Sequence, residues 1–215
     1  MIKSEIDSKK FFVREFFLPF ERLDLSYGWR AIENSKRAHY LDIIDEKTVA
    51  VSGDGQFIFF ETQNFNKKKL DQKRIDSNLE EILEKENFKL IGLRDLLIDE
   101  DKLYISAILQ DKNKNYTISI MTAKFKINKL EFEFFFNTEM KLKNYSIGTG
   151  GRIVKFKDNK ILLTIGHFSV PDKAQDLNHL AGKIISINKF DKKHELISLG
   201  HRNQQGLFYY QDESG

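Results

Sequence analysis

Residues Gly151–Thr164 of the 215-residue chain read GRIVKFKDNKILLT, a pattern that indicates its fold. Two apolar runs, Gly151–Phe156 and Ile161–Thr164, flank the short polar segment Lys157–Lys160. Runs rich in Ile, Val, Leu and Phe that end at Asp or Asn residues are typical of β-strands joined by a turn. The stretch therefore predicts an antiparallel hairpin.

The same pattern occurs twice earlier in the chain, at Tyr40–Ser52 and at Gly92–Ser106. Its turn lysines, Lys47, Lys102 and Lys160, lie 55 and 58 residues apart. Self-similarity at a nearly fixed period indicates a repeated supersecondary unit, because each copy needs its neighbours to bury its apolar face.

Further apolar runs follow the hairpins. The third runs are Phe57–Phe60, Thr117–Met121 and Lys183–Ile187, and the fourth runs are Leu130–Phe136 and Glu195–Leu199. Four strands in a repeat of roughly 40–50 residues are typical of a β-propeller, in which each repeat forms one blade. The predicted fold class is all-β, a partial β-propeller of about three four-stranded blades. An antiparallel β-sandwich with accidental periodicity is the alternative.

The repeat divides the chain into segments of a single incomplete β-propeller domain that spans 1–215. These are an N-terminal segment (1–39), blade 1 (40–90), blade 2 (91–140), blade 3 (150–199) and the start of blade 4 (206–215). The run Gly206–Tyr210 is expected to be the first strand of the fourth blade. Because propellers close with typically 4–8 blades, we expect the sequence to be the N-terminal part of a longer protein.

Three segments depart from the strand pattern. Residues 78–85 have apolar side chains at helical spacing, and Ser77 with Glu80 could form a capping box at the start of this short helix. The aromatic run Phe11–Phe20 fits an edge strand that closes the ring or a segment that packs under a blade. The insertion Pro171–Leu180 is either a functional loop or a helical turn that covers a blade.

The composition excludes several classes of protein. There are no cysteines, so disulfide scaffolds, zinc ribbons and cysteine nucleophiles are excluded. A formal charge of +3 spread over the chain does not indicate a nucleic-acid partner. The chain has no uncharged apolar run long enough for a transmembrane segment, and its five histidines do not have the spacing of a metal site. The sequence does not indicate an oligomeric state.

Four blocks within residues 150–206 carry a resemblance to a known family. In order they are Gly150–Ile153, Leu163–Gly166, Ala174–Ile184 and Gly200–Leu207. In this order they resemble the glucose/sorbosone dehydrogenases, soluble six-bladed β-propellers that include sugar dehydrogenases dependent on pyrroloquinoline quinone (PQQ) and calcium. Residues 91–140 fit the preceding blade of the family more loosely.

The resemblance implies a function and a set of site residues. Family members oxidise a small-molecule sugar by hydride transfer from its anomeric carbon to PQQ, with a histidine as general base. The family's Gly-His-Arg-Asn block supplies two quinone-binding residues, which are Arg202 and Asn203 here. Calcium as a second cofactor and export from the cytoplasm are implied by the family alone, since no signal peptide is visible.

One departure from the family affects the chemistry. The family's general base begins a His-x-Gly-Gly-Arg pattern, and this chain has Gly148 in that place. Glycine cannot accept a proton, so the base must be another residue or be missing. His167, just after a predicted strand, is the candidate catalytic residue because histidine accepts protons near neutral pH. A non-catalytic binding or scaffold propeller of the same fold is the alternative function.

Overall fold

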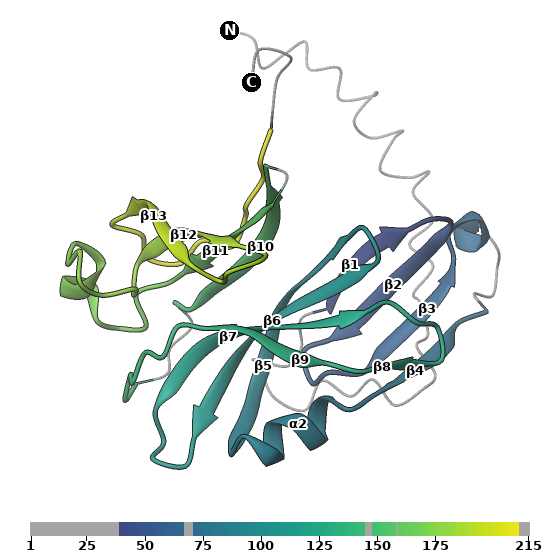
Figure 1. The fold of residues 1–215 in the computed structure, drawn as a ribbon, viewed down its shortest axis with the longest axis horizontal. Coiled ribbons are helices and arrows are strands. Elements are labelled where there is room, and N and C mark those ends of the chain that lie inside the picture. The colour runs from purple at the N-terminus through teal and green to yellow at the C-terminus, as the bar shows by residue number, and fades with distance from the viewer. Residues whose placement is uncertain (1–38, 67–70, 145–147, 158, 211–215) are drawn as a thin grey trace, which may run out of the picture.

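The computed structural model describes residues 39–66, 71–144, 148–157 and 159–210. In these residues the strands form three sheets that stand side by side as blades (Figure 1). The first strands of the blades, β1 (His39–Ile44), β5 (Phe88–Asp99) and β10 (Gly150–Phe156), are neighbours, with β5 in the middle. The predicted all-β, partial β-propeller fold is confirmed.

Blade 1 has one strand more than the predicted unit. Its strands pair in the order β1, β2 (Lys47–Ser52), β3 (Phe57–Glu61), β4 (Lys73–Ser77) and β8 (Lys129–Leu130). A 3₁₀ turn, η2 (Thr62–Asn66), follows β3. The apolar pattern missed β4 because its sequence, KRIDS, contributes only the buried Ile75 to the core.

Blades 2 and 3 follow the predicted order more closely. Blade 2 consists of β5, β6 (Lys102–Asp111), β7 (Tyr116–Lys124) and β9 (Glu133–Asn137). Blade 3 consists of β10, β11 (Lys160–Ile165), β12 (Lys183–Asn188) and β13 (His194–Leu199), with the 3₁₀ turn η3 (Pro171–Ala174) between β11 and β12. The predicted run Leu130–Phe136 is divided, because β8 pairs in parallel with β4 of blade 1 while β9 pairs with β7.

The short helix α2 (Leu79–Lys85) is present, but its predicted cap is wrong. Asn78, and not Ser77, is the N-cap residue, and it makes no side-chain capping bond. Its side-chain oxygen instead accepts the Phe132 N–H at 2.6 Å, and its amide donates to the Phe132 carbonyl at 3.2 Å. The Asn78 side chain therefore ties the start of α2 to the link between β8 and β9.

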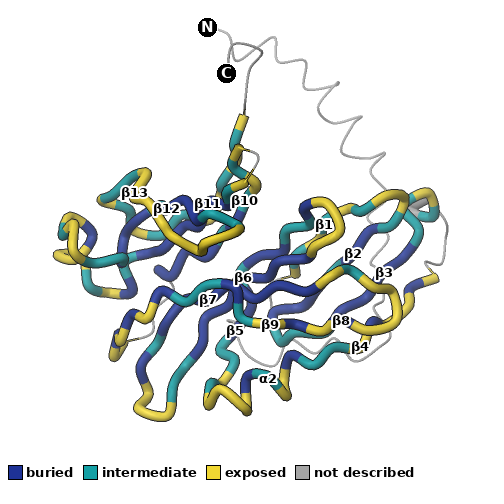
Figure 2. Tube along the Cα trace, in the orientation of Figure 1, coloured by how far each residue is buried: buried dark blue, intermediate teal, exposed yellow. Residues whose placement is uncertain are grey.

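Two apolar cores lie between the blades, and β6 contributes to both. Leu103, Ile105 and Leu109 belong to the core shared with blade 1, whereas Tyr104 and Ile108 belong to the core shared with blade 3. The middle strands of all three blades are accordingly buried along most of their length (Figure 2). This explains why the sequence shows continuous apolar runs rather than alternation, since these strands are covered on both faces.

A repeated carboxylate contact joins the first strands of successive blades. Asp42 of β1 accepts the N–H of Ile43 at 2.8 Å and, across the blade boundary, the N–H of Ile98 at 2.6 Å. Asp95 of β5 repeats this arrangement, accepting the N–H of Leu96 at 3.0 Å and that of Ile153 in β10 at 2.8 Å. Each aspartate thus satisfies a backbone donor of the next blade, where an unsatisfied buried N–H would be costly.

Asp95 is also the centre of an ionic contact among the blades. Arg152 of β10 pairs with its carboxylate at 3.2 Å and lies over the ring of Tyr40 in β1, with 5.5 Å between the guanidinium carbon and the ring centroid. Asp95 is almost fully buried, and this burial raises its pKa to about 6 despite the N–H donors and Arg152.

The segment after β13 differs from the prediction. Residues 206–210 form no strand, because within the described part of the chain no strand lies beside them to complete a ladder. Tyr209 packs edge-on against Phe156 of β10, whereas Phe208 and Tyr210 are exposed. The aromatic run Phe11–Phe20 and residues 211–215 lie outside the described residues.

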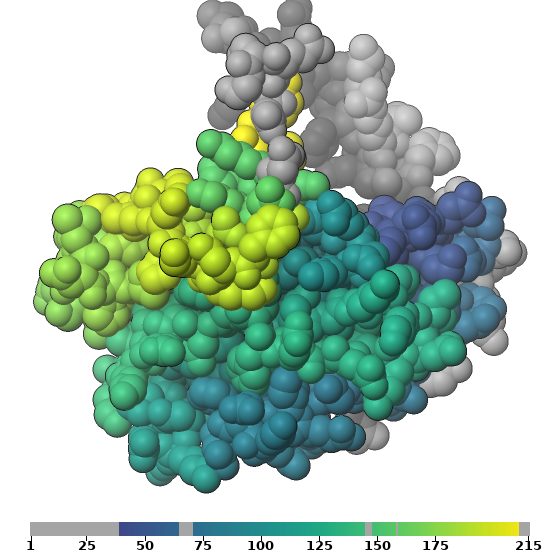
Figure 3. Space-filling view, viewed as in Figure 1, coloured from purple at the N-terminus to yellow at the C-terminus, as the bar shows by residue number. Residues whose placement is uncertain are grey.

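In the space-filling view, the three blades form one continuous surface, from blue through teal and green to yellow (Figure 3). Among the described residues, no helix has the length and apolar character needed to cross a membrane.

The raised pKa of Asp95 leads us to expect a specific pH dependence of the free energy of unfolding. The folded-state Asp95 pKa of about 6 lies above the ordinary aspartate pKa of 3.8, so its proton stabilises the fold most fully below about pH 4. This contribution to the free energy of unfolding is lost as the pH rises through 6, and Asp95→Asn removes the titration. We expect the stability of the native chain relative to Asp95→Asn to fall by roughly 2 kcal/mol between pH 4.5 and 7.5 in urea unfolding. A difference that is constant or rises with pH would contradict this assignment.

Candidate functional site

Three sequence blocks that resemble the family meet at one end of blade 3. The Gly166 N–H donates to the Thr149 carbonyl at 2.9 Å, and the Phe168 N–H donates to the Gly148 carbonyl at 3.0 Å. The His167 N–H donates to the Arg202 carbonyl at 3.0 Å. Backbone hydrogen bonds therefore place Gly148, His167 and Arg202, which are far apart in sequence, at one site.

Thr164, at the end of β11, holds this site together. Its buried hydroxyl accepts the N–H groups of Gly151 at 3.1 Å and Arg152 at 2.9 Å, and it donates to the Gln204 carbonyl at 3.3 Å. Gly150 and Gly151 form an irregularity in the β10–β11 ladder that leaves these donors without strand partners. One hydroxyl thus replaces the missing ladder bonds and connects β10 to the segment that carries Arg202.

Gly151 is required by both its backbone and its surroundings. Its φ is +100°, and a Cβ built on it would come within 2.4 Å of the Arg94 Cβ in β5. The Ser106 hydroxyl of β6 also donates to the Gly151 carbonyl. Only glycine permits this approach of blades 2 and 3 at the edge of the site.

The His167 ring lies beside Gly148. A Cβ built on Gly148 would lie 3.4 Å from His167 Cε1 and 3.6 Å from Nδ1, so the imidazole occupies the space beside residue 148. The Ser169 N–H donates to Nδ1 at 2.9 Å. Because that bond occupies the Nδ1 lone pair, the neutral ring carries its proton on Nε2.

Arg202 and Asn203 differ in how they are held. The Arg202 side chain is exposed, and among the described residues it makes no ion pair or hydrogen bond. The Asn203 side-chain oxygen accepts the Gly150 N–H at 3.1 Å and the Gln205 amide at 2.6 Å. This fixes the orientation of the Asn203 amide, whose N–H₂ group makes no hydrogen bond within the described residues.

The sequence prediction did not include the residues of the inner strands near this site. Tyr40, Asp95 and Arg152 form the contact described above, and the Arg94 stem packs against Gly151. Their signal in the sequence was a pair of charged residues, Arg94 and Asp95, inside an otherwise apolar run. Because charges are rarely buried unless they are paired, this pair could have been recognised as an inter-blade contact.

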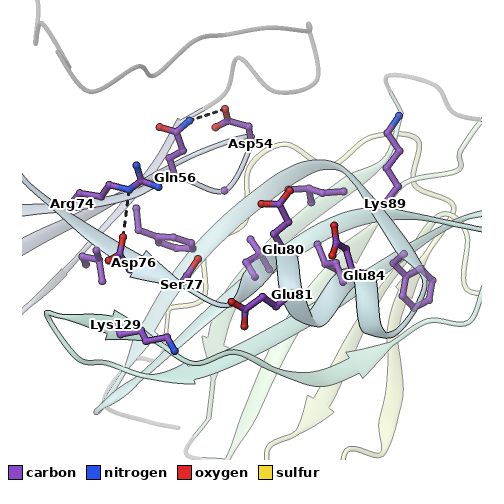
Figure 4. A pocket seen from close by; sticks show the side chains of 17 residues that line it. Asp54, Gln56, Arg74, Asp76, Ser77, Glu80, Glu81, Glu84, Lys89 and Lys129 are labelled. Atoms are coloured by element: carbon purple, nitrogen blue, oxygen red, sulfur yellow. Dashed lines mark hydrogen bonds and ion pairs between the residues drawn. The ribbon is translucent and has the colours of Figure 1, made fainter.

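A groove lies away from this site, between α2 and the strands β3 to β5. It has a volume of about 720 Å³, and no residue of the Gly148–His167–Arg202 site lines it. Glu80, Glu81 and Glu84 of α2 are at its edge, with Arg74 and Lys89 nearby (Figure 4). Within the described residues, no group of three or more His, Asp or Glu side chains could hold a metal ion.

These features define a β-propeller-type protein in which an exposed guanidinium, Arg202, and an oriented amide, Asn203, lie at the end of the third blade. A family model described as glucose/sorbosone dehydrogenase matches residues 47–215. The chain therefore belongs to the glucose/sorbosone dehydrogenase family, as the sequence blocks predicted.

Solved structures agree on the fold. A glucose dehydrogenase crystal structure superposes with a TM-score of 0.59 at 16% identity, over 80% of this chain and 54% of that one. The apo soluble aldose sugar dehydrogenase of Escherichia coli gives 0.59 at 16% identity, over 79% and 52% of the two chains. The PQQ-bound aldose sugar dehydrogenase of Streptomyces coelicolor gives 0.52 at 16% identity, over 80% and 52%.

The chain spans about half the length of these solved structures. No curated protein sequence matches it significantly.

The role of Thr164 can be tested with two variants. Thr164→Val keeps the shape but leaves the N–H groups of Gly151 and Arg152 without an acceptor, so we expect a loss of about 2–4 kcal/mol of unfolding free energy. Thr164→Ser keeps the hydroxyl and should cost about 1 kcal/mol, the contribution of one methyl group. Denaturant unfolding followed by circular dichroism measures both. Equal losses in the two variants would show that the hydroxyl is not what holds the site.

Proposed function

We propose that this chain forms the quinone-binding part of a sugar dehydrogenase of the PQQ-dependent type. The observation that carries the proposal is the placement of Arg202 and Asn203 beside Gly148 and His167, with the Asn203 amide oriented by its bond to the Gly150 N–H. Family membership and a PQQ-bound solved structure of the same fold support this choice of ligand.

The residues at the site fit the chemistry of PQQ. Its carboxylates and quinone oxygens are hydrogen-bond acceptors, and the site presents donors: the unpaired Arg202 guanidinium and the Asn203 N–H₂ group. Arginine offers a permanent charge and a planar fork suited to a carboxylate. When bound, PQQ accepts the hydride removed from the sugar. In this proposal Arg202 binds and orients the ligand, and Asn203 donates a hydrogen bond to an oxygen.

His167 takes the place of the missing base in this proposal. Its ring lies beside Gly148, where the family's histidine would project. In the neutral form Nε2 carries the proton, because Nδ1 accepts the Ser169 N–H. To accept the proton of a sugar hydroxyl at Nε2, the ring must therefore give up the Ser169 bond and protonate Nδ1 instead.

The hydrogen bond from the Ser169 N–H to His167 Nδ1 also favours a second function. Gly148 supplies no base, and the Ser169 bond holds His167 in the tautomer that donates at Nε2. A propeller that binds the quinone without oxidising a sugar fits this geometry. Calcium, a sugar substrate and export are further parts of the dehydrogenase proposal, and they are supported by family membership alone.

Ligand binding tests the roles of Arg202 and Asn203. We expect Arg202→Met and Asn203→Ala each to weaken PQQ binding to the full-length protein by roughly 10–100-fold, the effect of losing a hydrogen bond to a charged group. Arg74→Met is a matched control, because Arg74 is an exposed arginine at the α2 groove. Titration calorimetry measures the dissociation constants. A control that weakens binding as much as Arg202→Met would refute the assignment.

Variants that move the imidazole from position 167 to position 148 distinguish a sugar dehydrogenase from a propeller that only binds the quinone. Dye reduction with PQQ, calcium and a panel of sugars is measured for the native protein, for His167→Ala, and for Gly148→His combined with His167→Ala. If His167 is the base, its removal lowers turnover by 10²–10⁴-fold and the double variant restores it. If only the double variant turns over, the native protein is the non-catalytic binder. If neither turns over although PQQ binds, the dehydrogenase proposal fails.

A further inference from the structure

A buried lysine lies at the start of β12, next to the site. Lys183 is only 1% exposed, although lysine is among the residues least often buried. Its ammonium donates to three backbone carbonyls, those of Lys173, Ala174 and Ala181, each at 2.9 Å. All three ammonium hydrogens are therefore used, and the partners are neutral carbonyls rather than a carboxylate.

These carbonyls belong to the β11–β12 loop, defined here as residues 166–182. The Ala174 carbonyl also accepts the Gly200 N–H at 2.9 Å, and the Gly182 carbonyl accepts the His201 N–H at 3.0 Å. The loop thus connects the Lys183 ammonium with Gly200 and His201, the two residues directly before Arg202.

The loop is packed too closely for its parts to shift independently. Gly182 has φ of +72°, and a Cβ built on it would come within 2.5 Å of the Ala174 Cβ and 2.8 Å of the His201 carbonyl. The Gly182 N–H also donates to the Gly166 carbonyl at 3.0 Å, beside His167. A change at the three carbonyls is therefore transmitted to the backbone that precedes Arg202.

The energetics show why a charge is needed at this position. Burial opposes the charged form and lowers the pKa of Lys183. The three carbonyls converge on one point, and an apolar side chain there would remove one donor from each of them. The Lys173 and Ala174 carbonyls would then keep only the N–H groups of Asp176 and Gly200. The single Lys183 ammonium donates a hydrogen bond to each of the three carbonyls and so holds this part of the loop together.

We propose that Lys183 is a positioning residue of the quinone site. Its ammonium holds three carbonyls of the β11–β12 loop together by hydrogen bonds, and it thereby fixes the backbone that carries Arg202 and Asn203. The proposal rests on the proposed function for its ligand, and its structural part can be measured without the ligand.

The test compares Lys183→Met with Lys189→Met in the full-length protein. Lys189 is also a mostly buried lysine of blade 3, but it pairs with Asp99 of blade 2 at 2.5 Å. We expect Lys183→Met to raise the hydrogen-exchange rates of the Gly200 and His201 amides at least tenfold and to weaken PQQ binding roughly tenfold. Lys189→Met should change neither. Unchanged exchange at Gly200 and His201 in a folded Lys183→Met protein would overturn the proposal, as would the same effect in both variants.

Chemical rescue provides a second variant in case Lys183→Met does not fold. Lys183→Ala lacks the three carbons and the nitrogen that n-propylammonium can replace. We expect n-propylammonium, but not tetramethylammonium, to restore slow exchange at Gly200 and His201, because only the former donates hydrogen bonds to the carbonyls. Rescue by both ions, or by neither, would contradict the positioning role.

The two proposals fail in different ways. If the native protein does not bind PQQ while Lys183→Met still raises the hydrogen-exchange rates of the Gly200 and His201 amides, the quinone proposal fails. The proposal that Lys183 positions this backbone then stands. If PQQ binds equally well to the native protein and to Lys183→Met, Lys183 is not a positioning residue of the quinone site.

Discussion

The buried carboxylate of Asp95 is the contact on which the arrangement of the blades depends most. It accepts the N–H of Ile153 from the next blade and pairs with Arg152, which lies over Tyr40 of the first blade. Three blades therefore meet around one side chain. Asp42 makes the corresponding contact one blade earlier, so the contact is part of the repeat itself. Because Asp95 fixes the first strand of blade 3, it also determines where the glycines that precede this strand lie, and with them the site.

The site is then built outward from that strand by backbone hydrogen bonds. Thr164 supplies the acceptor that the irregular start of β10 lacks, and its hydroxyl reaches the segment after Arg202. Lys183 holds the β11–β12 loop from the other side. The side chains assigned to ligand binding have few bonds of their own, whereas the backbone beneath them is densely bonded. This division is consistent with the proposed binding site, because a rigid scaffold would hold side chains whose hydrogen-bonding groups a ligand could satisfy.

The sequence predicted the fold well where strands are buried and poorly where they are not. Turn lysines and apolar runs located β10, β11 and β12 because strands that are covered on both faces are mostly apolar. The strand β4, which lies between β3 and the two-residue strand β8, has a single buried side chain and gave no such signal. The contact between the Asn78 side chain and the Phe132 backbone gave no local signal, because the two residues are 54 positions apart. The expected strand at Gly206–Tyr210 requires a neighbouring strand, which the described residues do not supply.

For the candidate site, the family resemblance predicted Arg202 and Asn203. No local sequence pattern could show that His167 packs beside Gly148 or that Lys183 donates to three carbonyls. Both contacts depend on how the β11–β12 loop folds back. We propose that this loop and the Gly148–Arg152 turn form a quinone site. A crystal structure of the full-length protein with PQQ would show where the quinone binds. We expect PQQ oxygens within hydrogen-bonding distance of the Arg202 guanidinium and the Asn203 amide. PQQ bound only elsewhere, for example in the α2 groove, would contradict this proposal.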